Sequence, residues 1–276
     1  TAFGVAAALP IGGADMPVMI SLLNSTSGVA AALAGFAVGN WLLVGTGAIV
    51  GAAGLMLTLT MGRAMNRSLP EILAGRGLKP TPAPPPVATA EPTGAQTAPA
   101  DPFAAAVAAL RAATRVVVVP GYGMALAQAQ HELKRLADRL ADGGRSIVYA
   151  VHPVAGRMPG HMHVLLAEAD VPYEQLLDLD PGNEALAGAD AALVVGANDV
   201  VNPAARTAVG TPIHGMPVLA VAEARQVIVC NKDTAPGYAG VPNPLYEDPR
   251  ALLLLGDAAD TLRRLADALA TANDPG

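Results

Sequence analysis

A glycine turn, Gly121-Tyr122-Gly123, follows an apolar run at residues 116–119 and Pro120, and it precedes a segment rich in alanine and glutamine. Four consecutive valines are typical of a buried parallel strand, which is covered on both faces and needs no polar alternation. A strand, a glycine turn and a helix together direct backbone N–H groups and the positive end of the helix toward a phosphate. The spacing therefore predicts a phosphate-binding turn, although a lone G-x-G motif is not specific.

Charged side chains lie in other loops of the same region. Arg157, Asp199 and Lys232 each lie in a loop that follows a predicted strand. Because the carboxyl ends of parallel strands meet at one edge of a sheet, we expect these loops to converge there with the glycine turn. A guanidinium group can bind two phosphate oxygens at once, and an ammonium group adds a point charge. The sequence therefore predicts a nucleotide site at this edge.

The end of the second predicted strand favours NADP over NAD. A fold that binds NAD usually carries an acid there, which holds the ribose 2′-hydroxyl. Here the strand ends in Val151-His152, and Lys232 brings a positive charge to another loop. That arrangement suits a 2′-phosphate.

Several polar residues have two interpretations. His161 and His163 are either metal ligands without an evident third partner or surface or phosphate-side histidines. Asp199 is either a proton-coupled switch or a helix cap, and Tyr238 either closes over a ligand or packs its loop. Cys230, the only cysteine, ends an apolar run, which indicates an inert strand residue. No nucleophile arrangement is evident, so we expect the domain to hold a reactive cofactor.

These loops require an α/β fold with a parallel sheet. The expected strands cover residues 115–119, 146–151, 191–195, 217–221, 226–230 and 251–255, and the expected helices cover 102–113, 124–141 and 258–270. Six strands in about 170 residues fit a doubly wound, Rossmann-like sheet.

The N-terminal part has a different character. No charged side chain occurs between Met16 and Gly62. Segments 16–39 and 41–62 are each long enough to cross a bilayer, which takes about 20 apolar residues. We therefore expect a transmembrane helical hairpin within residues 1–70. Arg63 and Arg67 then mark its cytoplasmic end.

Small and polar residues within this hairpin suggest further roles. Small residues recur in both segments, at Gly28, Ala32, Gly35, Gly47, Gly51 and Gly54, and predict packing within a larger bundle. Asp15 lies at the mouth of the first segment and Asn24 within it. Both could belong to a proton or ion path. Otherwise Asp15 is an interfacial aspartate, and Asn24 makes a hydrogen bond between helices.

The remaining features set domain limits and exclude one class of partner. Residues 71–101 are rich in proline and alanine and predict a linker, which leaves a nucleotide-binding domain at 102–276. The net charge of −6, without a basic patch, gives no reason to expect nucleic-acid binding. The chain begins at Thr1 with no basic n-region, and we interpret it as the C-terminal part of something longer.

The sequence resembles a known family, the beta subunit of proton-translocating NAD(P) transhydrogenase. The matching stretches are GGADMP from Gly12, AMNRS from Ala64, VVPGYGMALAQAQ from Val118, HPVAGRMPGHMHVLLAEADVPY from His152, GANDVVNPAA from Gly196, GMPVL from Gly215, GYAGVPNPLY from Gly237 and LLGDA from Leu254. They occur in one order over nearly the whole chain apart from the linker.

The resemblance implies a Re/Si-specific membrane enzyme that couples hydride transfer between NAD(H) and NADP(H) to proton translocation. This chain would supply the NADP(H) site and the last two spans. Its partners would be an NAD(H)-binding alpha subunit or domain, the remaining transmembrane domain, the lipid bilayer and a second protomer. The implied location is the bacterial inner membrane, with the NADP domain in the cytoplasm.

Carried over by position, the family's functional residues fall on the predicted loops. The implied cofactor contacts are Gly121, Tyr122, Gly123, Val154, Ala155, Gly156, Arg157, Met158, Pro159, Gly196, Ala197, Asn198, Asp199, Val200, Gly215, Met216, Asn231, Lys232, Asp233, Thr234, Ala235, Pro236, Gly237, Tyr238, Asp257 and Ala258. Asp199 resembles the family's coupling acid, which favours the switch over the cap. Asn24 and Asp15 match polar positions near the proton path.

The sequence departs from the family pattern in two places that bear on the site. The lid at 231–238 usually begins Lys-Arg-Ser, which grips the 2′-phosphate, and here begins Asn231-Lys232-Asp233. Leu126 replaces a smaller residue at the end of the glycine motif, which predicts a wider spacing of helix and strand. A rival interpretation of the chain is a membrane-tethered, non-enzymatic NADP-binding regulatory module.

Overall fold

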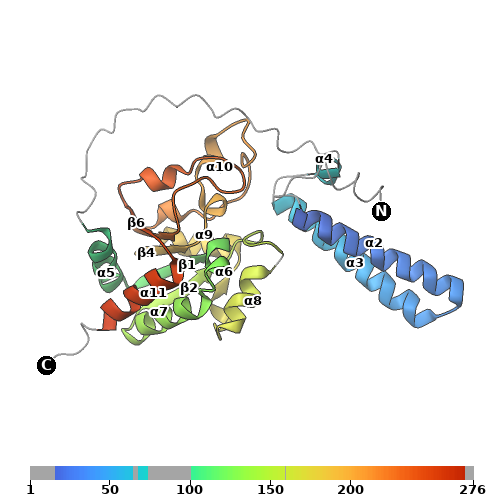
Figure 1. Ribbon diagram of the computed structural model, residues 1–276, viewed down its shortest axis with the longest axis horizontal. Coiled ribbons are helices and arrows are strands. Elements are labelled where there is room, and N and C mark those ends of the chain that lie inside the picture. The colour runs from blue at the N-terminus through green and yellow to red at the C-terminus, as the bar shows by residue number, and fades with distance from the viewer. Residues whose placement is uncertain (1–15, 65–67, 74–100, 159, 271–276) are drawn as a thin grey trace. The chain divides into compact units, whose positions relative to one another are not determined.

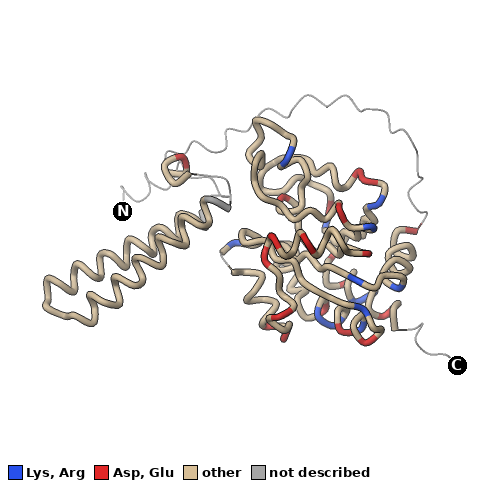
Figure 2. The backbone as a smooth tube through the Cα atoms, turned by 180° about the vertical axis from the view of Figure 1, so that it is seen from behind, with Lys and Arg blue, Asp and Glu red and all other residues tan. Residues whose placement is uncertain are grey.

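A computed structural model describes residues 16–64, 68–73, 101–158 and 160–270 of the chain (Figure 1). The chain divides into two compact units, Thr1–Pro82 and Ala83–Gly276. Among the described residues, the first contains two long helices and a short one, and the second contains a single sheet with its covering helices. Charged residues are absent from the two long helices up to Gly62 and dense in the second unit (Figure 2).

The first unit is a helical hairpin of α2 (Met16–Val38) and α3 (Trp41–Ala64). Both helices are long and apolar enough to cross a membrane. A tight turn joins them: Gly39 adopts φ +70°, and Asn40 N–H donates to the Gly35 carbonyl at 2.9 Å. Asn40 Oδ1 then accepts the Leu43 N–H at 3.1 Å, so this asparagine caps the second helix.

Small residues bring the two long helices into backbone contact. A Cβ atom at Gly28 would lie 2.5 Å from Gly51 N, and one at Gly47 would lie 2.5 Å from Ala32 N. Close approach also lets hydroxyl groups bridge the helices, because Ser25 Oγ donates to the Gly51 carbonyl at 2.7 Å. The small residues therefore pack the hairpin against itself. The short helix α4 (Leu69–Leu73) adds Ile72 to a buried cluster with residues of both long helices.

The second unit is a six-stranded parallel sheet in the order β3-β2-β1-β4-β5-β6, as the sequence predicts for a doubly wound fold. The strands are β1 (Arg115–Pro120), β2 (Ser146–Ala150), β3 (Leu176–Leu177), β4 (Ala191–Val195), β5 (Gln226–Asn231) and β6 (Ala251–Leu255). Alternate residues of each central strand face opposite cores, so Val116 and Val118 pack on one side and Val117 and Val119 on the other.

Helices cover both faces of this sheet. One core receives residues of α5 (Pro102–Ala112), α6 (Tyr122–Leu126), α7 (Gln130–Asp142), α8 (His161–Glu168) and α11 (Ala258–Ala270). The other core receives residues of α9 (Leu179–Ala187) and of the 3-10 turns Asp199–Val201, Val221–Glu223 and Pro244–Glu247. Ion pairs such as Arg263 with Glu132 join α11 to its neighbour α7 (Figure 1).

The single helix expected at residues 124–141 is wrong, because two helices occupy this stretch. The first ends after Leu126, and Gln128 adopts φ +49°. Ala129 N–H donates to the Met124 carbonyl at 3.0 Å and Gln128 N–H to the Ala125 carbonyl, which is a Schellman ending with glutamine in the usual glycine position. Leu126 is 67% exposed, so its larger side chain does not separate helix and strand.

The strand expected at residues 217–221 is also wrong. Side chains take the hydrogen bonds that a sheet neighbour would otherwise make. Asn183 Nδ2 donates to the Val218 carbonyl at 3.2 Å, and Asn183 Oδ1 accepts the Ala220 N–H at 2.8 Å. The sixth strand is instead β3, whose two residues pair with Tyr149 and Ala150.

Substitution of Gly196 tests the close backbone contact between the residue after β4 and α6. A Cβ atom at Gly196 would lie 2.2 Å from Met124 N at φ +67°, whereas at Gly210, with φ +85°, nothing lies within 4 Å. We expect Gly196→Ala to lower the free energy of unfolding by about 3 kcal/mol and Gly210→Ala by about 1 kcal/mol. Urea unfolding followed by circular dichroism measures both, and equal losses would contradict the steric account.

Candidate functional site

The glycine turn lies where the chain reverses its direction across the sheet. Strands β1 and β4 are neighbours, β2 and β3 extend from one side, and β5 and β6 from the other. At this point Gly121 N–H donates to the Val195 carbonyl and Gly123 N–H to the Gly196 carbonyl, both at 2.8 Å. A Cβ atom at Gly121 would lie 2.4 Å from Ala197 Cα. The topological switch point is therefore closed by direct backbone packing.

This packing changes the role expected of the turn. Its two glycine N–H groups donate to the end of β4 and the loop after it, and they are not directed at a ligand. The helix that follows, α6, is only five residues long, so its dipole is small. Charge for binding an anion must then come from side chains of the surrounding loops.

The loop after β2 supplies the first such charge, and a buried histidine holds its beginning. His152 Nε2–H donates to the Pro217 carbonyl at 2.8 Å, and Nδ1 accepts the Val154 N–H at 3.2 Å. Burial lowers the pKa of His152, against a smaller opposing effect of the bond to Pro217. The neutral ring thus ties this loop to the segment that precedes β5. Ala155 is buried beside it, while Arg157 and Met158 are exposed.

Arg157 belongs to a cluster of rings from three elements. Its Cζ lies 4.6 Å from the centre of the Tyr122 ring, and its guanidinium hydrogen-bonds to Tyr238. The Tyr122 ring centre lies 6.4 Å from that of Tyr238 and 6.3 Å from that of His161. The structure therefore brings the glycine turn, the loop after β2 and the lid together, as the sequence predicts for strand-end loops.

Asp199 lies beneath the lid, in the 3-10 turn after β4. Its Oδ2 accepts the Ala239 N–H at 3.0 Å, and Tyr238 N–H also donates to the carboxylate. Gly237 packs on the same group, because a Cβ there would lie 2.7 Å from Asp199 Cγ. Burial raises the pKa of Asp199, although the two backbone N–H donors oppose the shift. Oδ1 is buried without a hydrogen-bond partner among the described residues.

The lid is anchored at its base by asparagine side chains. Asn231 is buried and donates to the Ala197 carbonyl at 3.0 Å and to the Tyr246 hydroxyl at 2.9 Å. Asn198 Nδ2 donates to the Ala235 carbonyl at 2.8 Å, and Asp233 Oδ1 accepts the Ala235 N–H at 2.9 Å. Asn231 and Asn198 therefore hold the lid in place. Lys232, Thr234 and Pro236 are exposed.

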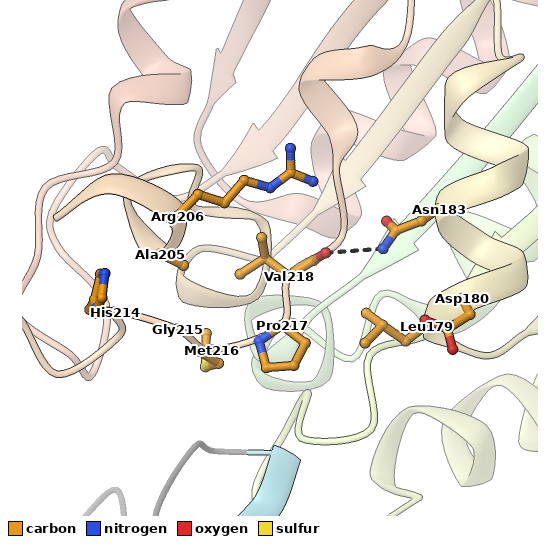
Figure 3. Close-up of a pocket in the computed structure, with 10 residues that line it drawn as sticks. All are labelled: Leu179, Asp180, Asn183, Ala205, Arg206, His214, Gly215, Met216, Pro217 and Val218. Carbon is orange, nitrogen blue, oxygen red and sulfur yellow. Dashed lines mark hydrogen bonds between the residues drawn. The ribbon is translucent and has the colours of Figure 1, made fainter. Parts of the chain in front are cut away.

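Two further pairs of expected contact residues differ in their surroundings. Asp257 and Ala258 follow Gly256, whose N–H donates to the Asn231 carbonyl at the base of the lid at 2.9 Å. Asp257 Oδ1 accepts the Asp260 N–H at 3.1 Å and so caps α11, next to the buried Ala258. Gly215 and Met216 line a pocket of about 320 Å³ together with residues of α9 and α10 (Ala204–Thr207) (Figure 3). None of the pocket's lining residues belongs to the glycine turn or the lid.

The membrane-side residues are only partly described. Asn24 lies on the exposed side of α2, whereas Ser21 and Ser25 on the same helix are buried. Asp15 and Pro159 lie outside the described residues. Within the described ranges no group of three or more His, Cys, Asp or Glu side chains could hold a metal ion. Burial raises the pKa of Cys230 to about 12, as expected of an unreactive strand thiol.

Sequence reasoning missed the side chains that support these loops. His152 and Asn243 are both buried, and Asn243 Nδ2 donates to Asn198 Oδ1 at 3.1 Å. Tyr246 reaches the same group of asparagines through Asn231. The available signal was the polar residue beside a proline in otherwise apolar sequence, at His152-Pro153 and Asn243-Pro244.

Comparison with known proteins identifies the family of this chain. Residues 1–268 match the family described as NAD(P) transhydrogenase beta subunit. Two curated relatives from Rhodospirillum rubrum, each named NAD(P) transhydrogenase subunit beta, are 47% identical over 269 residues. The chain belongs to this family. These matches cover 97% of this chain and 57% of the length of each relative.

A solved structure also aligns with part of this chain. A putative thiamin diphosphate-dependent enzyme from Mycobacterium smegmatis aligns with a TM-score of 0.36 at 15% identity. The match covers 63% of this chain and 28% of that one.

The raised pKa of Asp199 predicts a specific pH dependence of stability. A carboxyl group whose pKa is raised by folding stabilises the fold at low pH, and this contribution is lost as the pH rises above its ordinary value of 3.8 through the raised value. We therefore expect wild type to lose stability relative to Asp199→Asn between acid and neutral pH. Denaturant unfolding at several pH values measures the difference in stability between the two proteins. His152 changes stability with pH in the opposite direction, but it does so in both proteins and cancels in the difference. Parallel pH profiles for the two proteins would contradict it.

Proposed function

We propose that the unit at residues 102–276 binds NADP(H) and that the complete protein transfers hydride between NAD(H) and NADP(H), coupled to proton translocation. Family membership supports the reaction class, and the chain spans about 57% of the length of its curated relatives. The observation that carries the proposal is the meeting of Arg157, Tyr238 and Asp199 around the glycine turn at the switch point.

The residues at this edge fit a phosphorylated dinucleotide. Arg157 and Lys232 are exposed cations in loops at the same edge of the sheet, and Tyr122 and Tyr238 offer flat apolar surfaces there. The guanidinium group of Arg157 suits a phosphate, and Lys232 suits the 2′-phosphate that distinguishes NADP from NAD. Asp233 lies beside Lys232 and lowers the local positive charge. When bound, the nicotinamide supplies the hydride chemistry.

The contribution of this chain to the reaction is placement. Arg157 and Lys232 hold the phosphate groups, while the lid and the two tyrosines limit access of water to the site. No side chain described here needs to act as acid or base on the nicotinamide. A second site must carry NAD(H), and the word beta in the relatives' names supports a separate alpha subunit or domain in that role. Hydride transfer is then direct, from one cofactor to the other.

Coupling to protons is proposed to run through Asp199 and the lid. With the lid closed, Gly237 covers the carboxyl group and burial raises its pKa. An open lid would expose the group to water and return the pKa toward its ordinary value. Closing therefore takes up a proton and opening releases one, which is the two-state element that coupling requires. Asn24, and Asp15 near the same helix, are proposed to lie along the proton path.

The setting of the chain follows from its two apolar helices. We propose that α2 and α3 span the bacterial inner membrane beside further transmembrane helices of the complete protein. Arg63 and Arg67, directly after the second span, favour a cytoplasmic location for the NADP domain. The domain limits are then 1–70, a linker at 71–101, and 102–276. A dimer of protomers completes the proposed assembly.

Nucleotide selectivity tests the binding proposal. We expect the chain to bind NADPH at least about tenfold more tightly than NADH, because Lys232 makes a charge-assisted contact with the 2′-phosphate. Lys232→Ala should reduce NADPH affinity about tenfold and leave NADH affinity nearly unchanged. Lys134→Ala, at an exposed ion pair on α7, is the matched control. Titration calorimetry measures each dissociation constant, and equal affinity for the two nucleotides would sink the assignment.

Release of NADP(H) tests the proposed coupling. Asp199→Asn keeps a neutral side chain of the same shape under the lid, so the lid should favour its closed state at every pH. We expect NADPH to dissociate on the order of fivefold more slowly than from wild type at neutral pH, and without pH dependence. Stopped-flow fluorescence of bound NADPH measures the rate. A wild-type release rate with its normal pH profile would count against a switch at Asp199.

A further inference from the structure

We propose that His161 is a positioning residue, which fixes the backbone of Arg157 and the aromatic ring on which its guanidinium lies. The inference rests on the proposed function, in which Arg157 binds a phosphate of the nucleotide. His161 itself then touches no phosphate and acts through Arg157. Three contacts carry the inference, one to the Arg157 backbone, one to Gly156 and one to Tyr122.

The first contact is a hydrogen bond across the loop after β2. Arg157 N–H donates to His161 Nδ1 at 3.1 Å. Nδ1 therefore carries no hydrogen, and the neutral ring carries its hydrogen on Nε2. His152 makes the same kind of bond to Val154 N–H at the start of this loop. Two imidazole rings thus hold the loop, one near each end.

The second contact explains a glycine in the same loop. Gly156 adopts φ +104°, and a Cβ atom there would lie 2.4 Å from His161 Nδ1. The imidazole ring therefore packs directly on the Gly156 backbone. This position needs glycine both for its dihedral angle and for the space that the ring occupies.

The third contact connects His161 to the guanidinium end of Arg157. The His161 and Tyr122 ring centres lie 6.3 Å apart at an interplanar angle of 51°. Arg157 Cζ lies 4.6 Å from the centre of that same Tyr122 ring. His161 thus supports both the backbone of Arg157 and the surface on which its side chain rests.

The helix that carries His161 is a rigid support. His161 is the first residue of α8, and Met162 and Leu166 of this helix are fully buried in the core. Arg157, in contrast, is an exposed side chain with many rotamers. Fixing its backbone in advance reduces the conformational entropy lost when it binds a phosphate. The expected effect is on nucleotide affinity.

Ring and acceptor can be separated by two substitutions. His161→Phe keeps a ring on Gly156 and Tyr122 but removes the acceptor, and His161→Asn keeps an acceptor near the position of Nδ1. We expect His161→Phe to raise the dissociation constant for NADPH about five- to tenfold, and His161→Asn to stay within about twofold of wild type. His163→Phe makes the same change two residues along α8, where the imidazole faces Asp178 at 4.0 Å, and should have no effect.

A double-mutant cycle distinguishes positioning from general stability. If His161 acts through Arg157, His161→Phe should change the NADPH dissociation constant by less than about twofold when Arg157→Ala is already present. Calorimetry on the full chain in detergent measures all variants, and circular dichroism checks their folding. The same loss in both backgrounds, a similar loss in His163→Phe, or no loss in His161→Phe would each overturn the inference.

Two further outcomes keep the result decisive. If His161→Phe does not fold, His161→Asn and His161→Ala are compared: weaker binding by the alanine variant alone supports the inference, and equal binding overturns it. Wild-type protein that binds no NADPH would instead remove the proposed function itself.

Discussion

The contact on which this structure depends is the backbone packing of Gly121 and Gly123 against Gly196. It joins β1 to β4 beyond the ends of their ladder, and it leaves no room for a single Cβ atom at any of the three positions. The loop after β4 is thereby fixed against the glycine turn, and Asp199 follows three residues later. The lid then closes on Asp199. One short stretch of main chain thus aligns the loops at the carboxyl edge of the sheet, where we expect the ligand to bind.

This arrangement separates two tasks that a phosphate-binding turn usually combines. The glycine N–H groups are used to hold β4, so the turn contributes shape and little positive charge. Charge comes from Arg157 and Lys232 on loops that have no sheet neighbours of their own. Such loops need another means of fixation, and buried polar side chains supply it. His152 and Asn231 are both more than nine-tenths buried and bond to backbone or hydroxyl groups.

The sequence predicts the parts of the fold that rest on apolar patterning. The valine run at 116–119 and the charge-free hairpin can be predicted because an apolar environment selects residue types directly. The strand proposed at 217–221 fails because Asn183 satisfies its backbone, which depends on a residue over thirty positions away. The prediction of one continuous helix through Gln128 fails for another reason. Alanine and glutamine favour a helix and do not indicate a residue in the left-handed conformation. The sequence places Arg157 and Asp199 in loops after strands. It does not predict which side chains they contact, because those contacts are made by residues far away in the sequence.

The hydrogen bonds of the lid show why it can have two states. It is held at Asn198 through the Ala235 carbonyl, at Asp199 through the N–H groups of residues 238 and 239, and at Arg157 through Tyr238. The bonds to Asn198 and Asp199 each contribute about 1 kcal/mol net, so opening costs only a few kcal/mol. Elements of that stability open on their own and respond to a bound ligand or a proton. The buried Oδ1 of Asp199, which has no hydrogen-bond partner among the described residues, favours the protonated form under the closed lid. Under the proposed function, proton and nucleotide therefore act on the same few bonds.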